Sequence, residues 1–185
     1  GTDQASFQVS GANLQFKAGT TLDYETKSSY AVTVRTTDQG GLFYDKALTI
    51  TLTDVNEAPT NIALSASSVA ENTSTASALT IGALTSTDPD TGNTFTYSIV
   101  GGTDQASFQV SGANLQFKAG TTLDYETKSS YAVTVRSTDQ SGLTYDKPLT
   151  ITLTDVNEAP TAANSTSAGL TAATGRTGVV LATSG

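Results

Sequence analysis

An internal repeat constrains this chain more than any other feature of its sequence. Residues 1–60 recur at residues 102–161, an offset of 101 positions, with four differences. The differing pairs are Thr36/Ser137, Gly40/Ser141, Phe43/Thr144 and Ala47/Pro148. A repeat of this length matches a whole domain and exceeds one rung of a solenoid, so it predicts domains in tandem. We expect the C-terminal half of a module in 1–60, a complete module in 61–161, and the start of a further module or a strand-donating tail in 162–185.

Alternating apolar and polar residues predict β-strands in the complete module. Phe95, Tyr97 and Ile99 alternate with threonine and serine, a pattern typical of a half-buried strand. The segment 107–118 has a turn sequence, Ser111-Gly112-Ala113-Asn114, between two apolar runs, which predicts a hairpin. Further strands are expected at 62–64, 79–81, 131–135 and 149–153. About seven strands in about 100 residues favour an all-β fold of immunoglobulin-like seven-stranded β-sandwich modules in tandem.

The same pattern gives expectations for the core. In the first copy, strands are expected near 30–35 and 47–53, and all four differing positions are expected to fall between them, outside the core. The aromatic residues Tyr30, Tyr131, Phe95 and Tyr97 are expected to be core residues and not a binding platform.

Missing residue types exclude several functions. The chain has no Cys, His, Met or Trp, so it offers no disulfide, no thiolate metal site and no Ser-His-Asp relay. We therefore expect no enzyme. A net charge of -8 argues against nucleic acid and anionic membrane partners, and favours divalent cations. No apolar run reaches the roughly 18 residues that a membrane-spanning helix needs.

The carboxylates gather in short segments of the complete module. These segments are Glu71-Asn72, Asp88-Pro89-Asp90-Thr91-Gly92-Asn93, Leu123-Asp124-Tyr125-Glu126, Ser137-Thr138-Asp139 and Asp155-Val156-Asn157-Glu158-Ala159-Pro160. In this joint order they resemble the calcium-binding motifs of cadherin repeats, in the bacterial cadherin-like form of long repetitive surface adhesins. The resemblance covers the complete module and, in register, the first half-module. It implies Ca²⁺ bound between consecutive modules.

The resemblance also implies a ligand set for each junction. After the first half-module the set is Asp23, Glu25, Asp54, Asn56, Glu57, Asp88, Asp90, Asn93 and Asp139. Calcium prefers about six to eight oxygen ligands, and crowded carboxylates repel one another unless cations neutralise them. At the second junction the set is Glu71, Asp124, Glu126, Asp155, Asn157 and Glu158. The residues after Glu158 provide no Asp-x-Asp motif, so we expect weak or absent metal there.

Two departures from the family pattern limit the number of ions expected. Glu57-Ala58 and Glu158-Ala159 stand where the family usually has Asp-Asn, which removes one amide ligand at each junction. In the first copy, no residue of this sequence corresponds to Glu71, which is expected to bridge two ions.

Simpler interpretations of the acidic segments remain open. Residues 88–93 are also a standard turn composition. They do not fit an EF-hand, because Ile99 falls where that loop needs a bidentate Glu. Asp90-Thr91-Gly92 matches the aspartic-protease triplet, yet that chemistry needs two such carboxylates in a cleft. Asp124 and Glu126 are two residues apart, which favours surface chelation over glycoside hydrolysis.

The favoured function is mechanical. We expect an extracellular, cell-surface spacer or adhesion module whose junctions are stiffened by calcium, with neighbouring modules or other copies of itself as partners. One alternative is a filament subunit that assembles head to tail when 162–185 completes the half-module 1–60 of another chain. Another is an adhesive module that recognises glycans or cell-surface proteins.

Overall fold

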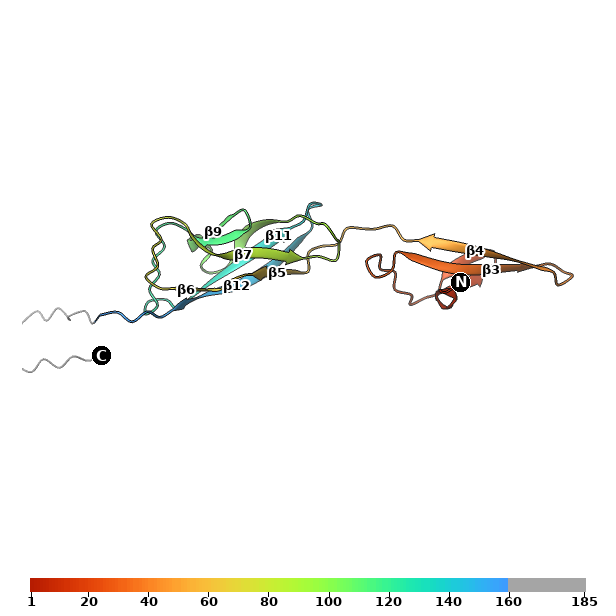
Figure 1. Ribbon diagram of the computed structural model, residues 1–185, viewed down its shortest axis with the longest axis horizontal. Coiled ribbons are helices and arrows are strands. Elements are labelled where there is room, and N and C mark those ends of the chain that lie inside the picture. The colour runs from red at the N-terminus through yellow and green to blue at the C-terminus, as the bar shows by residue number, and fades with distance from the viewer. Residues whose placement is uncertain (160–185) are drawn as a thin grey trace, which may run out of the picture.

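The computed structural model describes residues 1–159, and these residues form an all-β protein (Figure 1). The expectations for 162–185, including strand donation, lie outside the described residues. Within them the fold class predicted from the sequence is confirmed: the regular elements are strands and two 3₁₀ turns, without an α-helix. The two turns, η1 (Gln4–Ser6) and η2 (Gln105–Ser107), occupy equivalent places in the two copies of the repeat.

Residues 61–154 form a complete β-sandwich of two four-stranded sheets. One sheet has the order β5-β7-β10-β9 and the other has the order β6-β12-β11-β8. The strands are β5 (Asn61–Leu64), β6 (Ser68–Ala70), β7 (Leu79–Thr87), β8 (Thr96–Gly101), β9 (Phe108–Ser111), β10 (Asn114–Phe117), β11 (Ser130–Thr138) and β12 (Thr144–Thr154). The pairs are antiparallel except for β6 and β12, which run parallel.

The core of the sandwich follows from the period of two along each strand. In β11 the residues Tyr131, Val133 and Val135 are buried while their neighbours are partly exposed, because successive side chains point to opposite faces. Phe108 of β9 stacks on Phe117 of β10 with ring centroids 4.8 Å apart, and the edge of Tyr131 packs against both rings. The predicted core role of Tyr131 is therefore confirmed.

Residues 1–51 repeat the second half of that sandwich. They form the hairpin of β1 (Phe7–Ser10) and β2 (Asn13–Phe16) and the hairpin of β3 (Ser29–Thr37) and β4 (Phe43–Thr51). The registers match the second copy: Phe7 faces Phe16 as Phe108 faces Phe117. The apolar cluster here is smaller, with Phe7, Tyr30 and Val32 buried.

One expectation about the repeat is wrong. β3 extends to Thr37 and β4 begins at Phe43, so Thr36, Phe43 and Ala47 lie within strands and only Gly40 lies in the loop. In the second copy Ser137 is completely buried. The core therefore does contain one position at which the two copies differ. The prediction missed it because the outer part of the long hairpin has fewer apolar residues, although its backbone pairing continues to the turn.

Candidate metal centre

The acidic segments of the two modules meet where residues 1–60 join the sandwich. Four stretches without regular strands supply this junction: the loop 17–28 after β2, the linker 52–60 after β4, the loop 88–95 between β7 and β8, and the loop 139–143 between β11 and β12. Loops of this kind can direct several neighbouring polar side chains toward one point, whereas successive side chains of a strand point to opposite faces. We call this junction the first seam.

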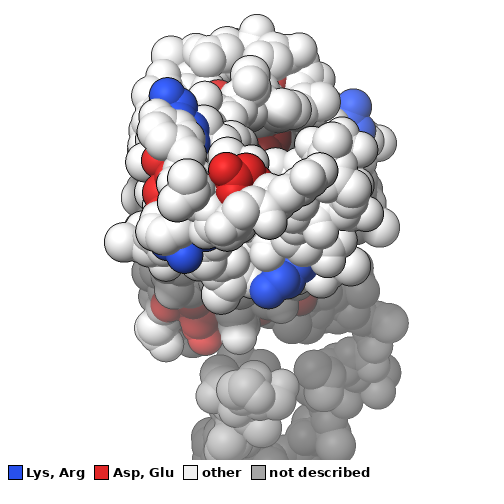
Figure 2. Space-filling model, turned by 90° about the vertical axis from the view of Figure 1, so that its right-hand side faces the viewer, with Lys and Arg blue, Asp and Glu red and all other residues white. Residues whose placement is uncertain are grey.

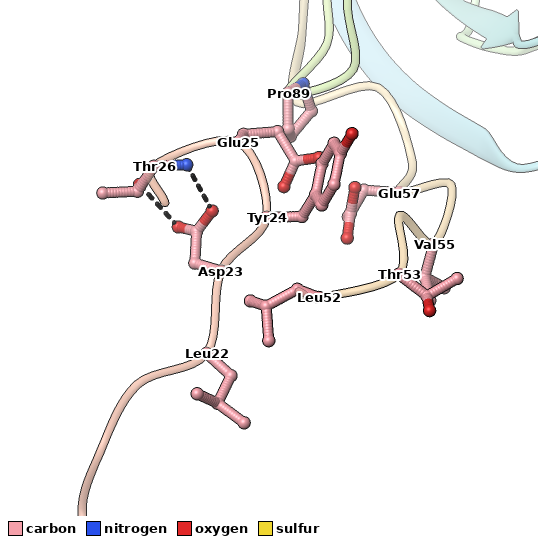
Figure 3. A pocket seen from close by; sticks show the side chains of 10 residues that line it. All are labelled: Leu22, Asp23, Tyr24, Glu25, Thr26, Leu52, Thr53, Val55, Glu57 and Pro89. Atoms are coloured by element: carbon pink, nitrogen blue, oxygen red, sulfur yellow. Dashed lines mark hydrogen bonds between the residues drawn. The ribbon is translucent and has the colours of Figure 1, made fainter. Parts of the chain in front are cut away.

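Four carboxylates converge at the first seam. Glu25, Asp54, Glu57 and Asp90 each place an oxygen within 4.8 Å of the others. Figure 3 shows Glu25 and Glu57 bordering one hollow, with Pro89 of the following module beside them. The hollow is open and has a volume of about 610 Å³. Three carboxylates therefore come from the first half-module and one from the sandwich.

Two hydrogen bonds cross the first seam directly. The side-chain amide of Asn56 donates to Asp139 Oδ2 at 2.7 Å. The backbone N–H of Glu57 donates to Asp90 Oδ2 at 2.9 Å. Asn56 and Glu57 follow each other in the linker, so this short segment holds the sandwich through two of its loops.

Buried polar atoms without partners mark the same place. Among the described residues, the buried side-chain polar atoms that lack a hydrogen bond are Glu57 Oε2, Asp88 Oδ2 and Asn93 Nδ2. All three residues belong to the ligand set predicted from the sequence. A buried unpaired polar atom costs free energy, so its persistence calls for a partner. A cation that binds oxygen supplies one for the two carboxylates.

Crowding of negative charge shifts the pKa of two of these groups. Burial raises the pKa of Glu57, and repulsion from Glu25 and Asp90 adds to the effect. For Glu25, a backbone hydrogen bond in its own loop lowers the pKa, but burial and repulsion from Asp54, Asp90 and Asp23 outweigh it, so the pKa is raised. Either protonation of a carboxylate or binding of a cation relieves this repulsion.

Some predicted ligands have structural partners in this arrangement. Asp23 accepts hydrogen bonds from the backbone N–H and the hydroxyl of Thr26, both at 2.9 Å, and so shapes the loop that presents Glu25 (Figure 3). Asp88 Oδ1 accepts from the backbone N–H of Asp90 at 3.0 Å, which leaves its buried Oδ2 free. Asp139 accepts from Asn56, which lowers its pKa together with backbone N–H donors of its loop.

Gln140 is a residue that the sequence analysis missed. Its side-chain amide donates to Asn93 Oδ1 at 2.8 Å and so fixes the orientation of that predicted ligand. In the sequence, its position directly after the predicted ligand Asp139 pointed to the site, but glutamine is not part of any of the acidic motifs.

The equivalent residues form a second group at the far end of the sandwich, the second seam. Glu71, Glu126, Asp155 and Glu158 place oxygens within 4.8 Å of one another. Glu126, Asp155 and Glu158 are the repeat partners of Glu25, Asp54 and Glu57, whereas the fourth member is Glu71 here and Asp90 in the first seam. Asp124 accepts hydrogen bonds from the backbone N–H and the hydroxyl of Thr127, as Asp23 does from Thr26. Asn157 bonds the backbone oxygen of Glu158 at 3.5 Å.

Glu71 also has a structural role at the second seam. It is only 3% exposed, and its two oxygens accept from the backbone N–H groups of Tyr125 and Val156, both at 2.7 Å. Both backbone hydrogen bonds lower the pKa of Glu71, the bond from Val156 more than the bond from Tyr125, so Glu71 stays ionised. Glu71 thus ties the 118–129 loop to the segment after β12.

The donors available decide which cation fits. The chain has no Cys or His, so the candidate ligand atoms at either seam are oxygens of carboxylates, amides or the backbone. Hard cations such as Ca²⁺ and Mg²⁺ prefer oxygen, and Ca²⁺ accepts the irregular geometry that flexible loops provide. The end of the molecule formed by the β3–β4 hairpin, in contrast, shows only scattered charged side chains (Figure 2).

Known proteins resemble this chain along most of its length. Cadherin-related family member 2 of Homo sapiens is 31% identical over 173 residues, covering 85% of this chain and 13% of that protein. Protocadherin Fat 1 of Homo sapiens is 27% identical over 165 residues, covering 86% of this chain and 4% of that protein. The chain therefore spans only a small part of the relatives it matches. No helix among the described residues is long and apolar enough to cross a membrane.

Solved structures show the same fold. The structure titled PcdhgB3 EC1-4 matches with a TM-score of 0.59 at 23% identity, over 82% of this chain and 37% of that chain. The protocadherin gammaB7 EC3-6 cis-dimer structure matches with a TM-score of 0.56 at 25% identity, over 81% of this chain and 39% of that chain. The Cadherin domain family itself matches residues 65–154. The matched stretch includes Asp90 of the first seam.

Proposed function

We propose that this chain is a calcium-stiffened spacer and adhesion segment of a repetitive extracellular protein. The observation that carries the proposal is the convergence of Glu25, Asp54, Glu57 and Asp90 from two modules. The buried unpaired oxygens of Glu57 and Asp88 support it, because they lie in the same predicted ligand set. The match of residues 65–154 to the Cadherin domain family supports the extracellular and adhesive setting.

Calcium stiffens the junction because its ligands come from segments of both modules. The linker 52–60 has no strand of its own and holds the sandwich by few direct hydrogen bonds. An ion bound by the loop 17–28, the linker and the loop 88–95 joins three segments at one point. Cation binding also removes the repulsion among the four carboxylates. The angle between the modules then becomes fixed, which is what a spacer requires.

The near-identity of the two copies supports a repetitive parent protein. Only four of 60 positions differ between residues 1–60 and 102–161. We propose a long cell-surface adhesin, of the bacterial cadherin-like type, in which such modules recur and hold a binding region away from the cell.

A calcium titration tests the site. Isothermal calorimetry on the chain should detect calcium binding at the first seam, and the double substitution Asp88→Ala with Asp90→Ala should weaken that binding at least tenfold. Asp45→Asn is the matched control, since Asp45 is an acidic residue of β4 that pairs with Arg35. Circular dichroism should show the sandwich intact in both variants. Unchanged stoichiometry and affinity in the double variant contradict the assignment.

A further inference from the structure

A loop without a regular strand presents predicted ligands at each seam. In the complete sandwich this is the loop 118–129 between β10 and β11, which carries Asp124 and Glu126. Within the loop, the backbone N–H of Lys128 donates to the backbone oxygen of Asp124 at 2.8 Å. The loop therefore forms a closed turn around Glu126, and Lys128 stands at the end of this turn.

The side chain of Lys128 attaches this turn to the body of the sandwich. Its ammonium nitrogen lies 2.7 Å from Asp104 Oδ1 and 5.1 Å from the centre of the Tyr131 ring. The side chain of Asp104 is only 15% exposed, whereas that of Lys128 is 42% exposed. The lysine thus reaches from the surface to a carboxylate on the sandwich, and an aromatic face supports its ammonium group.

Asp104 is itself held by strand β11. Its backbone N–H donates to the backbone oxygen of Ala132 at 3.0 Å, and its Oδ2 accepts the N–H of Ala132 at 2.8 Å. The hydrogen bond from Lys128, and then the one from Ala132, lowers the pKa of Asp104, so this carboxylate is ionised at neutral pH. Strand β11 therefore holds Asp104, Asp104 holds Lys128, and Lys128 closes the turn around Glu126.

The first copy of the repeat has the same contacts. Lys27 pairs with Asp3, and its ammonium nitrogen lies 4.9 Å from the centre of the Tyr30 ring. Asp3 forms the same two bonds with Ala31, at 3.0 and 2.8 Å. The N–H of Lys27 donates to the backbone oxygen of Asp23 at 2.9 Å. The turn that ends at Lys27 is therefore held in the same way.

The positive charge of these lysines opposes calcium binding at the seams. Each lysine follows a carboxylate of a seam by two positions, as Lys27 follows Glu25. A positive charge repels a cation, so charge alone gives no reason for a lysine at this place. In both copies, however, the lysine pairs with an aspartate outside the predicted ligand set. The pair neutralises the lysine and at the same time anchors its turn.

We propose that Lys27 is a positioning residue of the first seam, which holds the turn that presents Glu25 through its ion pair with Asp3. Lys128 and Asp104 do the same for the second seam. This inference rests on calcium binding at the first seam, which is the proposed function. Without the ion pair the turn is less ordered, and an ion must then order it on binding, which lowers the affinity.

The substitution Lys27→Met separates positioning from the effect of charge. Removing a positive charge by itself strengthens calcium binding, whereas losing the anchor weakens it. Calorimetry on the full chain should show an affinity at the first seam about two- to tenfold lower, the usual effect of ordering a loose side chain on binding. Lys27→Arg keeps an ion pair with Asp3 and should restore the affinity. Arg35→Met is the matched control, because it removes a positive charge paired with Asp45, outside the ligand loops, and should not weaken binding.

A second readout needs no calcium. In EDTA, amide hydrogen exchange of residues 22–27 should be faster in Lys27→Met than in the unchanged chain, while β3 keeps its protection. Equal or tighter calcium binding by Lys27→Met overturns the proposal, and so does unchanged amide exchange in the turn. If the unchanged chain binds no calcium, the proposed function fails together with this inference. If it binds calcium and Lys27→Met binds equally well, only this inference fails.

Discussion

Asn56 and Asp139 lie 83 positions apart in the sequence, yet the side-chain amide of Asn56 donates to Asp139 Oδ2 at 2.7 Å. This bond joins the linker of one module to the loop between β11 and β12 of the next. It is a bond to an ionised acceptor, the stronger class of hydrogen bond. The two modules are thus held at the first seam by specific contacts in addition to the covalent chain.

Asn56→Ala should weaken calcium binding at the first seam. The substitution removes the bond that orients Asp139 and the bond of Asn56 to the backbone oxygen of Glu57. A hydrogen bond to a charged group contributes about 1.5–3 kcal/mol to stability, so without it Asp139 is less well oriented toward an ion and the calcium affinity should fall. Calorimetry measures it. Asn157→Ala, at the equivalent position, is the control and should leave the first seam unchanged; equal effects of both would contradict this role.

Calcium affinity should rise with pH above the ordinary glutamate pKa of 4.5. Burial first, and then repulsion from Glu25 and Asp90, raises the pKa of Glu57, so protons compete with the ion at a higher pH than for a free glutamate. Calorimetric titrations from pH 4.5 to pH 8 should show affinity increasing and then reaching a plateau. A pH-independent affinity would count against Glu57 and Glu25 as ligands.

Without metal, the first seam should become less stable as the pH rises, whereas its calcium affinity increases. A carboxyl group whose pKa is raised in the folded state binds its proton more tightly there than in the unfolded chain. Its favourable contribution is therefore full below 4.5 and is lost as the pH rises through the raised value. In EDTA, melting curves should show the seam weakening across this window. The loss should become smaller in Glu57→Gln, which cannot titrate at this position, while the raised pKa of Glu25 maintains part of it.

Phe117→Ala should destabilise the sandwich far more than Phe16→Ala destabilises the first half-module. Phe117 is fully buried, and replacing such a residue by alanine typically costs about 3–5 kcal/mol. Phe16 is its repeat partner but is only half-buried. Chemical denaturation followed by circular dichroism and by amide exchange in each module measures the two losses. Equal losses would show that the first half-module is packed as completely as the sandwich.

Gly102→Ala should be strongly destabilising, whereas Gly101→Ala should be tolerated. Gly102 has a φ of 101°, and a Cβ added there would lie 2.4 Å from the Cα of Val133. At Gly101 the nearest atom would be the Cβ of Thr134 at 3.6 Å, an ordinary contact. Thermal melts of the two variants compare them directly. Similar melting temperatures would mean that the backbone shifts more easily than this packing indicates.

The sequence predicted the fold well because its core strands alternate cleanly. The apolar residues of 131–135 and 149–153 lie in β11 and β12, and the hairpin 107–118 is β9 and β10. Three-residue β6 escaped prediction, since Ser68–Ala70 offers a single apolar side chain pointing to the core. Phe95 was expected in a strand but precedes β8, which begins at Thr96.

The candidate site was predictable as a set of segments but not as a geometry. Family resemblance supplied the ligand residues, and four of them do converge at each seam. No pattern in the sequence indicates that Asp23 bonds Thr26 or that Gln140 holds Asn93, because these contacts depend on loop conformation. The presence of Asp90 in the first group and Glu71 in the second agrees with the sets expected from the family resemblance.

The distance between the modules tests the central claim most directly. The chain has no cysteine, so Lys17→Cys and Lys118→Cys give two spin labels at exposed, equivalent positions of the repeat. Pulsed electron–electron double resonance then gives the distribution of the distance between the two labels. The account predicts a narrow distribution with calcium and a broad one after EDTA, with Asp88→Ala plus Asp90→Ala broad in both. A distribution that stays equally narrow without calcium would contradict it.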